Sequence, residues 1–234
     1  MRNRYYSNKK KCVVLLSGGL DSSTVLYYVI KKNFQPLCLI FDYFQRHKKE
    51  VVSAKNIAKS VNSKYYIIKT FFPWKGSALT NSKLKIPDCK LNDKKNSTIP
   101  TTYVPARNII FLSYAVSLAE VVGAKYIFYG ANQIDYSGYP DCRKIFYEKF
   151  NELIKVGTKP TTNITIETPL ISMSKAEIVR KGMELNAPFH LTWSCYKDQE
   201  IACGVCDSCA LRLRGFQKAG FEDPIPYRVK PKYI

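Results

Sequence analysis

The stretch VVLLSGGLDSSTVLYY, residues 13–28, places a glycine-rich turn between two apolar runs, and it constrains the fold more than any other feature of the chain. The continuous apolar run before the turn predicts a strand that is buried on both faces. Gly18 and Gly19 permit a sharp bend, and the Asp and Ser residues after them favour a helix start. A strand, a glycine turn and a helix start together aim free N–H groups and a helix dipole at one place, which predicts an anion site.

A nucleotide phosphate is the anion that this turn favours, and an ordinary strand-to-helix turn is the alternative. Small hydroxyl groups and the Asp21 carboxylate surround the two glycines, and such groups suit a phosphate that is bound together with Mg²⁺. The turn is not a Walker loop, because no Lys-Ser or Lys-Thr pair follows the second glycine.

Strand and helix patterns alternate along the chain. Strands are predicted at 13–16, 36–43, 64–70, 125–130 and 163–170, and helices directly after the glycine turn and at 47–61, 106–124, 142–157 and 174–185. This alternation predicts an α/β fold with a doubly wound, mostly parallel sheet. Ligands of such sheets bind at the carboxyl ends of the strands. Three further loops should therefore lie near the glycine turn, at 42–50, 103–108 and 130–144.

The length of 234 residues allows one substantial domain with a small appendage. Prolines and clustered cysteines begin at about Ala187, which predicts an α/β domain at 1–186 and a C-terminal lobe at 187–234. Ser174 and Glu177 predict a capping box at the start of the last helix before that lobe. No segment reads as a membrane span or a secretion signal, so we expect a cytoplasmic protein without a membrane partner.

The net charge of +19 raises the possibility of a nucleic-acid partner. Two observations oppose it. Lysine outnumbers arginine by 28 to 9, whereas groove and phosphate recognition favours arginine, and the lysines are scattered along the chain. A dedicated nucleic-acid surface is therefore the less favoured reading.

Four of the eight cysteines form the pattern C-x7-C-x2-C-x2-C in the C-terminal lobe: Cys195, Cys203, Cys206 and Cys209. Four thiolates at this spacing can close tetrahedrally on one ion. An iron–sulfur cluster and a redox-active C-x2-C pair are the alternatives. Zinc is favoured as a closed structural site that would join a short lobe to the core. Cys89, in the long polar loop at 70–102, has no partner at ligand spacing.

The order of SGGLDSS, QRH, YVPARN, SGYPDC, TWSCY and C-x2-C-x2-C resembles the 7-cyano-7-deazaguanine synthases, the QueC family of PP-loop ATP pyrophosphatases. The resemblance spans nearly the whole chain, from Cys12 to Tyr227, and implies the PP-loop form of the doubly wound sheet, an adenine nucleotide alpha hydrolase-like fold. One departure is visible. This chain has Phe44 where the family usually has glycine, which puts the backbone path before Gln45 in doubt.

The resemblance implies an ATP-dependent ligase that converts 7-carboxy-7-deazaguanine and ammonia to the nitrile 7-cyano-7-deazaguanine, in queuosine precursor synthesis. The acid is adenylated, ammonia gives an amide, and a second activation gives the nitrile. ATP, Mg²⁺ and Zn²⁺ are the implied cofactors, and a homodimer is implied. A PP-loop enzyme that acts directly on tRNA is the first alternative, and a zinc-dependent nucleic-acid module without catalysis is the second.

Residue roles follow from the same resemblance. The residues implied to contact ATP are Leu15, Leu16, Ser17, Gly18, Gly19, Leu20, Asp21, Ser22, Ser23, Thr24 and Val25. The residues implied to act in catalysis are Asp21 as the Mg²⁺ ligand, with Arg46, His47 and Arg107 to neutralise a phosphate or the substrate carboxylate. The residues implied to bind the substrate are Asn132, Asp135, Tyr139 and Asp141. The two aspartates would accept hydrogen bonds from the guanine-like edge, and Tyr136 or Tyr139 would stack on the base.

Overall fold

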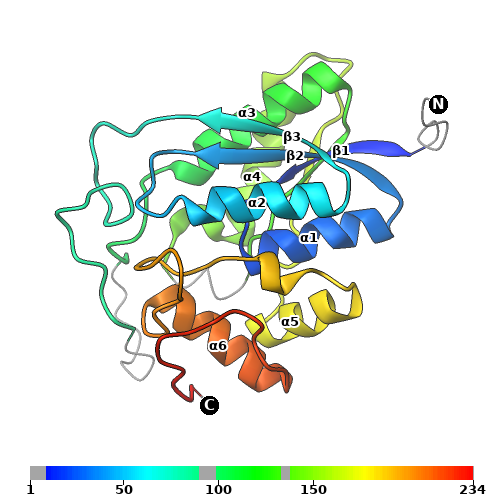
Figure 1. The fold of residues 1–234 in the computed structure, drawn as a ribbon. Helices are drawn as coiled ribbons and strands as arrows, with labels where there is room; N and C mark the ends of the chain where they lie inside the picture. Colours follow the sequence, from blue (N-terminus) through cyan, green and yellow to red (C-terminus); the bar gives the residue numbers. More distant parts are fainter. Residues whose placement is uncertain (1–8, 90–98, 133–137, 234) are drawn as a thin grey trace.

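A computed structural model describes residues 9–89, 99–132 and 138–233 and contains one five-stranded sheet with the order β3-β2-β1-β4-β5 (Figure 1). Every pair of neighbouring strands is parallel. The strands are β1 (Lys10–Leu15), β2 (Phe34–Asp42), β3 (Lys64–Lys69), β4 (Tyr126–Phe128) and β5 (Thr165–Glu167). The predicted doubly wound, parallel sheet is confirmed, with β4 and β5 shorter than the apolar patterns suggested.

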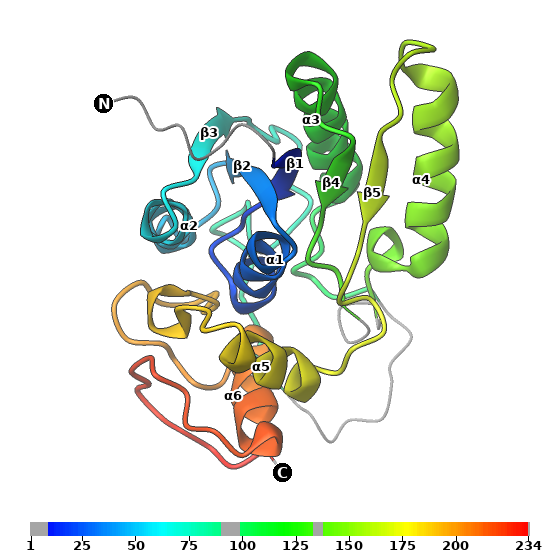
Figure 2. The ribbon, with the colours of Figure 1, turned by 90° about the vertical axis from the view of Figure 1, so that its right-hand side faces the viewer.

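Helices cover both faces of the sheet, as Figure 2 shows. They are α1 (Leu20–Lys31), α2 (Lys49–Ser60), α3 (Arg107–Val122), α4 (Lys144–Gly157), α5 (Lys175–Glu184) and α6 (Asp207–Ala219), with short 3-10 turns η3 (Pro140–Cys142) and η4 (Phe189–Leu191). Apolar side chains of α1, α2 and α5 pack in one core cluster, and those of α3 and α4 pack in the other. Alternate residues of β1 enter the two clusters, so β1 is buried on both faces as predicted.

Two helix ends follow the chemistry that the sequence predicts. At the start of α5, the Ser174 side chain accepts from Glu177 N and the Glu177 carboxylate accepts from Ser174 N, so the capping box is confirmed. At the end of α3, Gly123 adopts a left-handed φ of 68°, which closes the helix without a Cβ penalty.

The C-terminal segment lies along α5, below the sheet in Figure 1. It contains α6, a helix that the sequence analysis does not predict, because the cysteine spacing dominates that stretch. Each core cluster draws residues from both sides of position 187: Trp193 and Cys206 join one, and Phe216 packs in the other. The boundary between 1–186 and 187–234 stays a prediction, and the packing across it is continuous.

A buried ion pair holds the C-terminal segment together. Arg212 donates from Nε to Asp223 Oδ2 at 2.7 Å and from Nη2 to Oδ1 at 2.9 Å, and both side chains are almost fully buried. Arg212 also donates to Thr192 Oγ1 at 2.6 Å. Such a bidentate, fully satisfied pair fixes geometry, and removing one partner alone would strand a buried charge. Within the described ranges, no helix has the length and apolarity needed to cross a membrane.

Candidate active site

The glycine turn after β1 is built so that only glycine fits at its first position. Gly18 has φ 84°, and a Cβ there would lie 2.2 Å from the Glu50 carbonyl oxygen and 2.7 Å from the Ala54 nitrogen. The turn thus packs directly on the start of α2. Trp193 N donates to Gly18 O at 2.9 Å, which ties the C-terminal segment to the same turn.

Helix α1 begins at Leu20 with Gly19 as its N-cap, and no side chain caps it. The predicted helix-start residues Asp21 and Ser22 therefore lie inside the first turn. The Ser17 and Ser22 hydroxyl oxygens lie 3.0 Å apart and brace the turn from within. Because Gly19 supplies no capping group, the described residues leave the first N–H groups of α1 available to an anion.

The loop after β4 meets the glycine turn where the strand order changes direction, between β1 and β4. A Cβ on Gly130 would lie 3.1 Å from Ser22 N, so the two loops are in contact. Asn132 Nδ2 donates to Asp21 Oδ2 at 2.5 Å. The structure therefore brings Asn132, predicted as a substrate residue, against the predicted Mg²⁺ ligand.

Lys175 is a site residue that the sequence analysis missed. Its Nζ lies 2.7 Å from Asp21 Oδ2 and 2.9 Å from Oδ1, and the side chain is buried beside the turn. One signal could have found it. The capping box fixes the start of α5 just beyond the carboxyl end of β5, so the first residue of that helix must lie at the ligand-binding edge of the sheet.

A cavity of about 440 Å³ opens at this edge. The three loops that the sequence placed near the turn all contribute to it, together with residues 193–212. The predicted site residues that line it are Leu15, Leu16, Ser17, Gly19, Leu20, Asp21, Ser22, Arg46, His47, Arg107 and Tyr139. Those outside its lining are Gly18, Ser23, Thr24, Val25, Asn132 and Asp141. Asp135 and Tyr136 lie outside the described residues.

Arg107 forms the cationic centre of the cavity. It is the first residue of α3, and its Nη1 donates to Tyr43 OH at 3.3 Å. Burial alone would lower the pKa of Arg107, but the hydroxyls of Tyr43 and Tyr129 more than offset it and raise the pKa above its ordinary value. The guanidinium is thus a permanent positive charge among tyrosines, suited to a planar carboxylate.

Asp141 has a structural contact that the sequence analysis did not foresee. Its Oδ2 accepts from Asn108 N at 3.1 Å, so it caps the first turn of α3 from a distant segment. Asn108 in turn donates to Cys142 Sγ at 3.3 Å and accepts from Tyr129 OH at 2.7 Å. Burial raises the pKa of Asp141. Its predicted contact with the substrate stays a prediction.

His47 is buried, at 9% exposure, and lines the cavity. Within the part of the chain that the structure describes, neither ring nitrogen has a hydrogen-bond partner. Burial lowers the pKa of His47, which favours the neutral imidazole over the cation expected for phosphate neutralisation. Arg46 lines the cavity, and its Nη1 donates to Leu84 O at 3.0 Å.

The structure shows which backbone path the chain follows at Phe44, where the family usually has glycine. Its φ is 56°, in the left-handed region that favours glycine. Its ring is 57% exposed and packs edge-on against Phe71, with 5.9 Å between ring centres. The backbone therefore follows a glycine-type path with a phenylalanine in place, and Gln45 still reaches the core, where its Oε1 accepts from Tyr43 N at 2.9 Å.

The four clustered cysteines converge in the C-terminal segment. The sulfur atoms of Cys195, Cys203, Cys206 and Cys209 lie within 4.8 Å of one another, so together they could hold a metal ion. Backbone N–H groups point at these sulfurs, including Cys206 N at 3.3 Å from Cys203 Sγ. Hydrogen bonds from the thiols of Cys206 and Cys209 hold the pKa of the Cys195 thiol below its usual range. Four converging sulfurs with N–H donors around them fit a thiolate-bound metal.

The segment that ends at Cys89 packs on this cysteine cluster. Asp88 forms an isolated bridge with Cys206, and Cys89 N donates to Val205 O at 2.7 Å. Lys197 forms an ion pair with Asp88. Cys89 lies in the loop between β3 and α3, as expected. Its thiol is half-buried against the cavity, and burial raises its pKa to about 12.

These features define a class of protein: a doubly wound α/β protein with a glycine turn and an uncapped helix start at the switch point of its sheet, an arrangement suited to anions. The family model described as "Queuosine biosynthesis protein QueC" matches residues 11–220. The chain belongs to this family. Its relatives include proteins named 7-cyano-7-deazaguanine synthase from Acetivibrio thermocellus, 52% identical over 93% of this chain and 98% of that protein, and Chlorobium phaeobacteroides, 51% identical over 96% of this chain and 100% of that protein. A third, from Thermoplasma volcanium, is 48% identical over 96% of this chain and 93% of that protein.

Proposed function

We propose that this chain is an ATP-dependent ligase that converts 7-carboxy-7-deazaguanine and ammonia to 7-cyano-7-deazaguanine, in queuosine precursor synthesis. The observation that carries the proposal is one cavity that holds both a glycine turn suited to anions and a half-buried arginine among tyrosines. The turn suits the phosphates of ATP, and Arg107 suits the carboxylate of the acid.

The end of the cavity at the glycine turn binds the phosphates of ATP. The first N–H groups of α1 bind the outer phosphates, and Asp21 is the residue that would hold a Mg²⁺ ion bound with ATP. Lys175, now paired with Asp21, then faces the pyrophosphate and offsets the charge that develops as it leaves. Asn132 orients the Asp21 carboxylate through its 2.5 Å hydrogen bond.

The substrate end positions the acid and excludes water. Arg107 orients the carboxylate, and Tyr139 stacks on the base. The Tyr139 hydroxyl lies 2.8 Å from Thr102 Oγ1, which holds its ring in place. Asp135 and Asp141 remain proposed acceptors for the guanine-like edge, with Asp135 in a segment that the structure does not describe.

The chemistry then runs in two activations. A carboxylate oxygen attacks the α-phosphorus of ATP, the bond to the bridging oxygen breaks, and pyrophosphate leaves. Ammonia attacks the carbonyl carbon of the adenylate, and AMP leaves with one proton from nitrogen transferred to it or to water. A second ATP adenylates the amide oxygen, and loss of AMP with the remaining N–H protons yields the nitrile. The protein positions the reactants, stabilises the charge that develops and excludes water from the adenylate.

The ion at the four cysteines is proposed to be zinc in a closed, structural role. Four thiolates leave no coordination position open for a reactant, so the metal supplies folding energy to the segment 187–234. We further propose a cytoplasmic homodimer. Light scattering on the purified protein tests the oligomeric state, and a mass equal to one chain contradicts the dimer.

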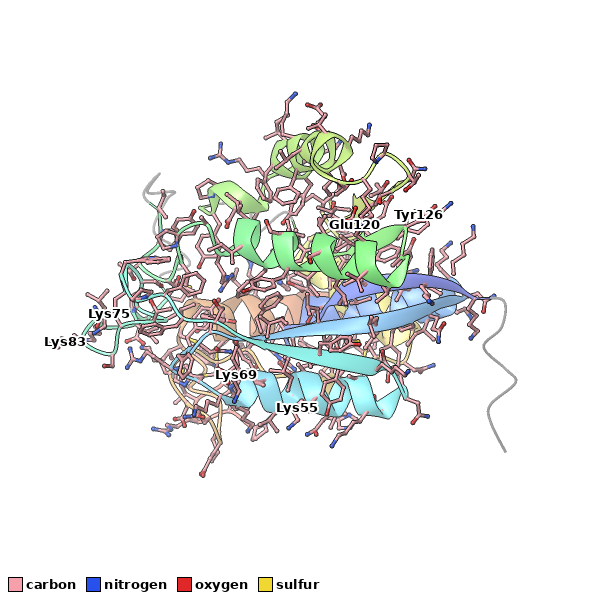
Figure 3. All side chains as sticks on the ribbon, turned by 90° about the horizontal axis from the view of Figure 1, so that it is seen from above. Lys55, Lys69, Lys75, Lys83, Glu120 and Tyr126 are labelled. Carbon is pink, nitrogen blue, oxygen red and sulfur yellow. The ribbon has the colours of Figure 1, made fainter. Side chains whose placement is uncertain are left out.

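A tRNA-acting enzyme is the alternative that the net charge of +19 raises, and the family match does not favour it. Figure 3 shows labelled lysines spread from α2, at Lys55, over the end of β3, at Lys69, to the segment after it, at Lys75 and Lys83. Filter binding with tRNA at rising salt separates the candidates. Tight binding with a steep salt dependence favours the tRNA enzyme, and weak binding favours the small-molecule ligase.

Incubation with ATP, ammonium and 7-carboxy-7-deazaguanine, followed by mass spectrometry, tests the main proposal. We expect the nitrile, with AMP and pyrophosphate formed in step with it. Formation of the amide alone would support a single activation and contradict the nitrile assignment. An unchanged acid, with ATP intact, would contradict the proposal as a whole.

A further inference from the structure

The carboxylate of Glu50 belongs to the cavity lining, but the roles proposed above do not use it. Glu50 is the second residue of α2 and lines the cavity. Its backbone position is fixed because its carbonyl oxygen packs on Gly18 of the glycine turn. Across residues 9–89, 99–132 and 138–233, the carboxylate forms no hydrogen bond and no ion pair, whereas Asp21 is paired with Lys175 and Asp141 caps α3.

His47, close to Glu50 in the chain, is a second residue of the cavity whose polar atoms lack hydrogen-bond partners. It lies one turn before Glu50, since the intervening Lys48 is already helical, with φ −74° and ψ −13°. Both ring nitrogens of His47 are buried without a partner among the described residues, although the ring lines the cavity. Buried polar groups that lack partners in the protein are commonly satisfied by a ligand or an ordered molecule. A neutral imidazole offers one lone pair, and a carboxylate offers several.

A small donor of hydrogen bonds would satisfy the imidazole lone pair and the carboxylate, and a positive charge would match the carboxylate. Arg107 lies close enough for its charge to lower the pKa of Glu50, but the two are not ion-paired in the described structure. Glu50 and Arg107 line the same cavity. A small cation held by Glu50 would therefore share that cavity with a carboxylate held by Arg107, as attack by ammonia requires.

We propose that Glu50 and His47 form the binding site for ammonium, and that Glu50 takes the proton that ammonium must lose before it can attack. This deepens the proposed ligase function and rests on it. The step balances: one N–H bond of ammonium breaks, its electron pair stays on nitrogen, and the proton goes to a Glu50 oxygen. Ammonia then forms the C–N bond as the C–O bond to AMP breaks.

The charges around Glu50 agree with a base at neutral pH. Burial raises the pKa of Glu50 to about 7, the Arg107 charge on α3 lowers it, and the Cys195 thiol of the C-terminal segment raises it. Tyr43, at the end of β2, also faces this carboxylate. A base whose pKa lies near the working pH combines the charged form with a useful proton affinity.

Kinetics of Glu50→Gln test the site, because the amide keeps the size and loses the charge. Pyrophosphate release with ATP and the acid, without ammonium, reports adenylation. Nitrile formation against total ammonium, at several pH values, reports the second substrate. We expect adenylation close to that of the unaltered protein, a KM for ammonium raised by about ten- to a hundredfold, and partial recovery at alkaline pH, where free ammonia is abundant. Glu148→Gln, on the exposed face of α4, is the matched control and should behave like the unaltered protein.

Three outcomes overturn the proposal. An unchanged KM for ammonium removes Glu50 from the ammonium site. A folded Glu50→Gln variant that fails to release pyrophosphate places Glu50 with ATP or the acid instead. If Glu50→Gln does not fold, Glu50→Ala is measured in its place, because it also removes the carboxylate, and a KM for ammonium equal to that of the unaltered protein has the same meaning. Failure of the unaltered protein to release pyrophosphate would contradict the ligase function itself, which separates the two claims.

Discussion

Lys175 Nζ lies 2.7 Å from Asp21 Oδ2, across 154 residues of chain. The pair joins the first turn of α1 to the first turn of α5 and closes the phosphate end of the cavity. Both side chains are mostly buried, at 11% and 16% exposure. Breaking such a pair leaves a poorly compensated charge next to the nucleotide site.

Asp21→Asn should abolish Mg²⁺ binding and keep the fold, because the amide has nearly the same size as the carboxylate. We expect turnover to fall by about two orders of magnitude or more. Lys175→Gln, measured beside it, should also lower turnover, and its melting temperature should fall, because the Asp21 carboxylate loses the charge that it is paired with. Near-normal nitrile formation by Asp21→Asn would show that the assigned role is wrong.

Phe44→Gly should leave the protein equally stable or stabilise it by up to about 1 kcal/mol, because relief of a left-handed φ outweighs the entropy cost of glycine. Phe44→Ala keeps the strained backbone and loses the ring contact with Phe71, so it should be less stable than Phe44→Gly. Urea unfolding of the two variants gives the comparison. A Phe44→Gly variant less stable than Phe44→Ala would contradict the strain argument.

Cys206→Ser should lose the metal and give a poorly soluble or protease-sensitive protein, because one ligand of four is removed. Cys89→Ser should keep the metal, since Cys89 lies outside the set of four converging sulfurs, and it controls for the loss of a thiol. Metal analysis should find about one zinc per chain in the unaltered protein. A brown, iron-containing protein, or one that folds equally well after the metal is stripped, would contradict a structural zinc.

The pKa of Glu50 predicts how stability changes with pH. Its folded value of about 7 lies above the ordinary 4.5, so the folded state holds the proton more tightly. This contribution to stability is complete below about 4.5 and is lost as pH rises through about 7. Glu50→Gln has no such titrating group. Its free energy of unfolding, relative to that of the unaltered protein, should therefore increase between pH 5 and 7.5. If urea unfolding gives free energies that change with pH in parallel for the two proteins, the raised pKa of Glu50 is contradicted.

The excess of lysine predicts little dependence of activity on salt. Scattered surface lysines interact weakly with a small substrate in an enclosed cavity, because salt screens surface charges beyond about 10 Å. Nitrile formation should change less than about twofold between low and physiological salt. A loss of several hundredfold would indicate a polyanionic partner.

Local pattern was enough to predict the sheet, most of its helices and two sites. Val13–Leu16 alternates between the two core clusters because a continuous apolar run needs cover on both faces. The glycine turn and the four cysteines were predictable because their chemistry depends on short spacing, and such spacing is visible in the sequence. The capping box of α5 was predictable for the same reason.

Contacts between distant segments decided the rest. Lys175 meets Asp21, Asp141 caps α3, and Glu50 shares a cavity with Arg107, and no spacing in the sequence indicates any of these pairs. The sequence determined which short segments can form strands, turns and metal ligands, because those depend on neighbours a few residues apart. Only the tertiary structure decided which polar groups are already satisfied and which face the cavity unpaired. That depends on how five parallel strands bring their carboxyl ends to one edge.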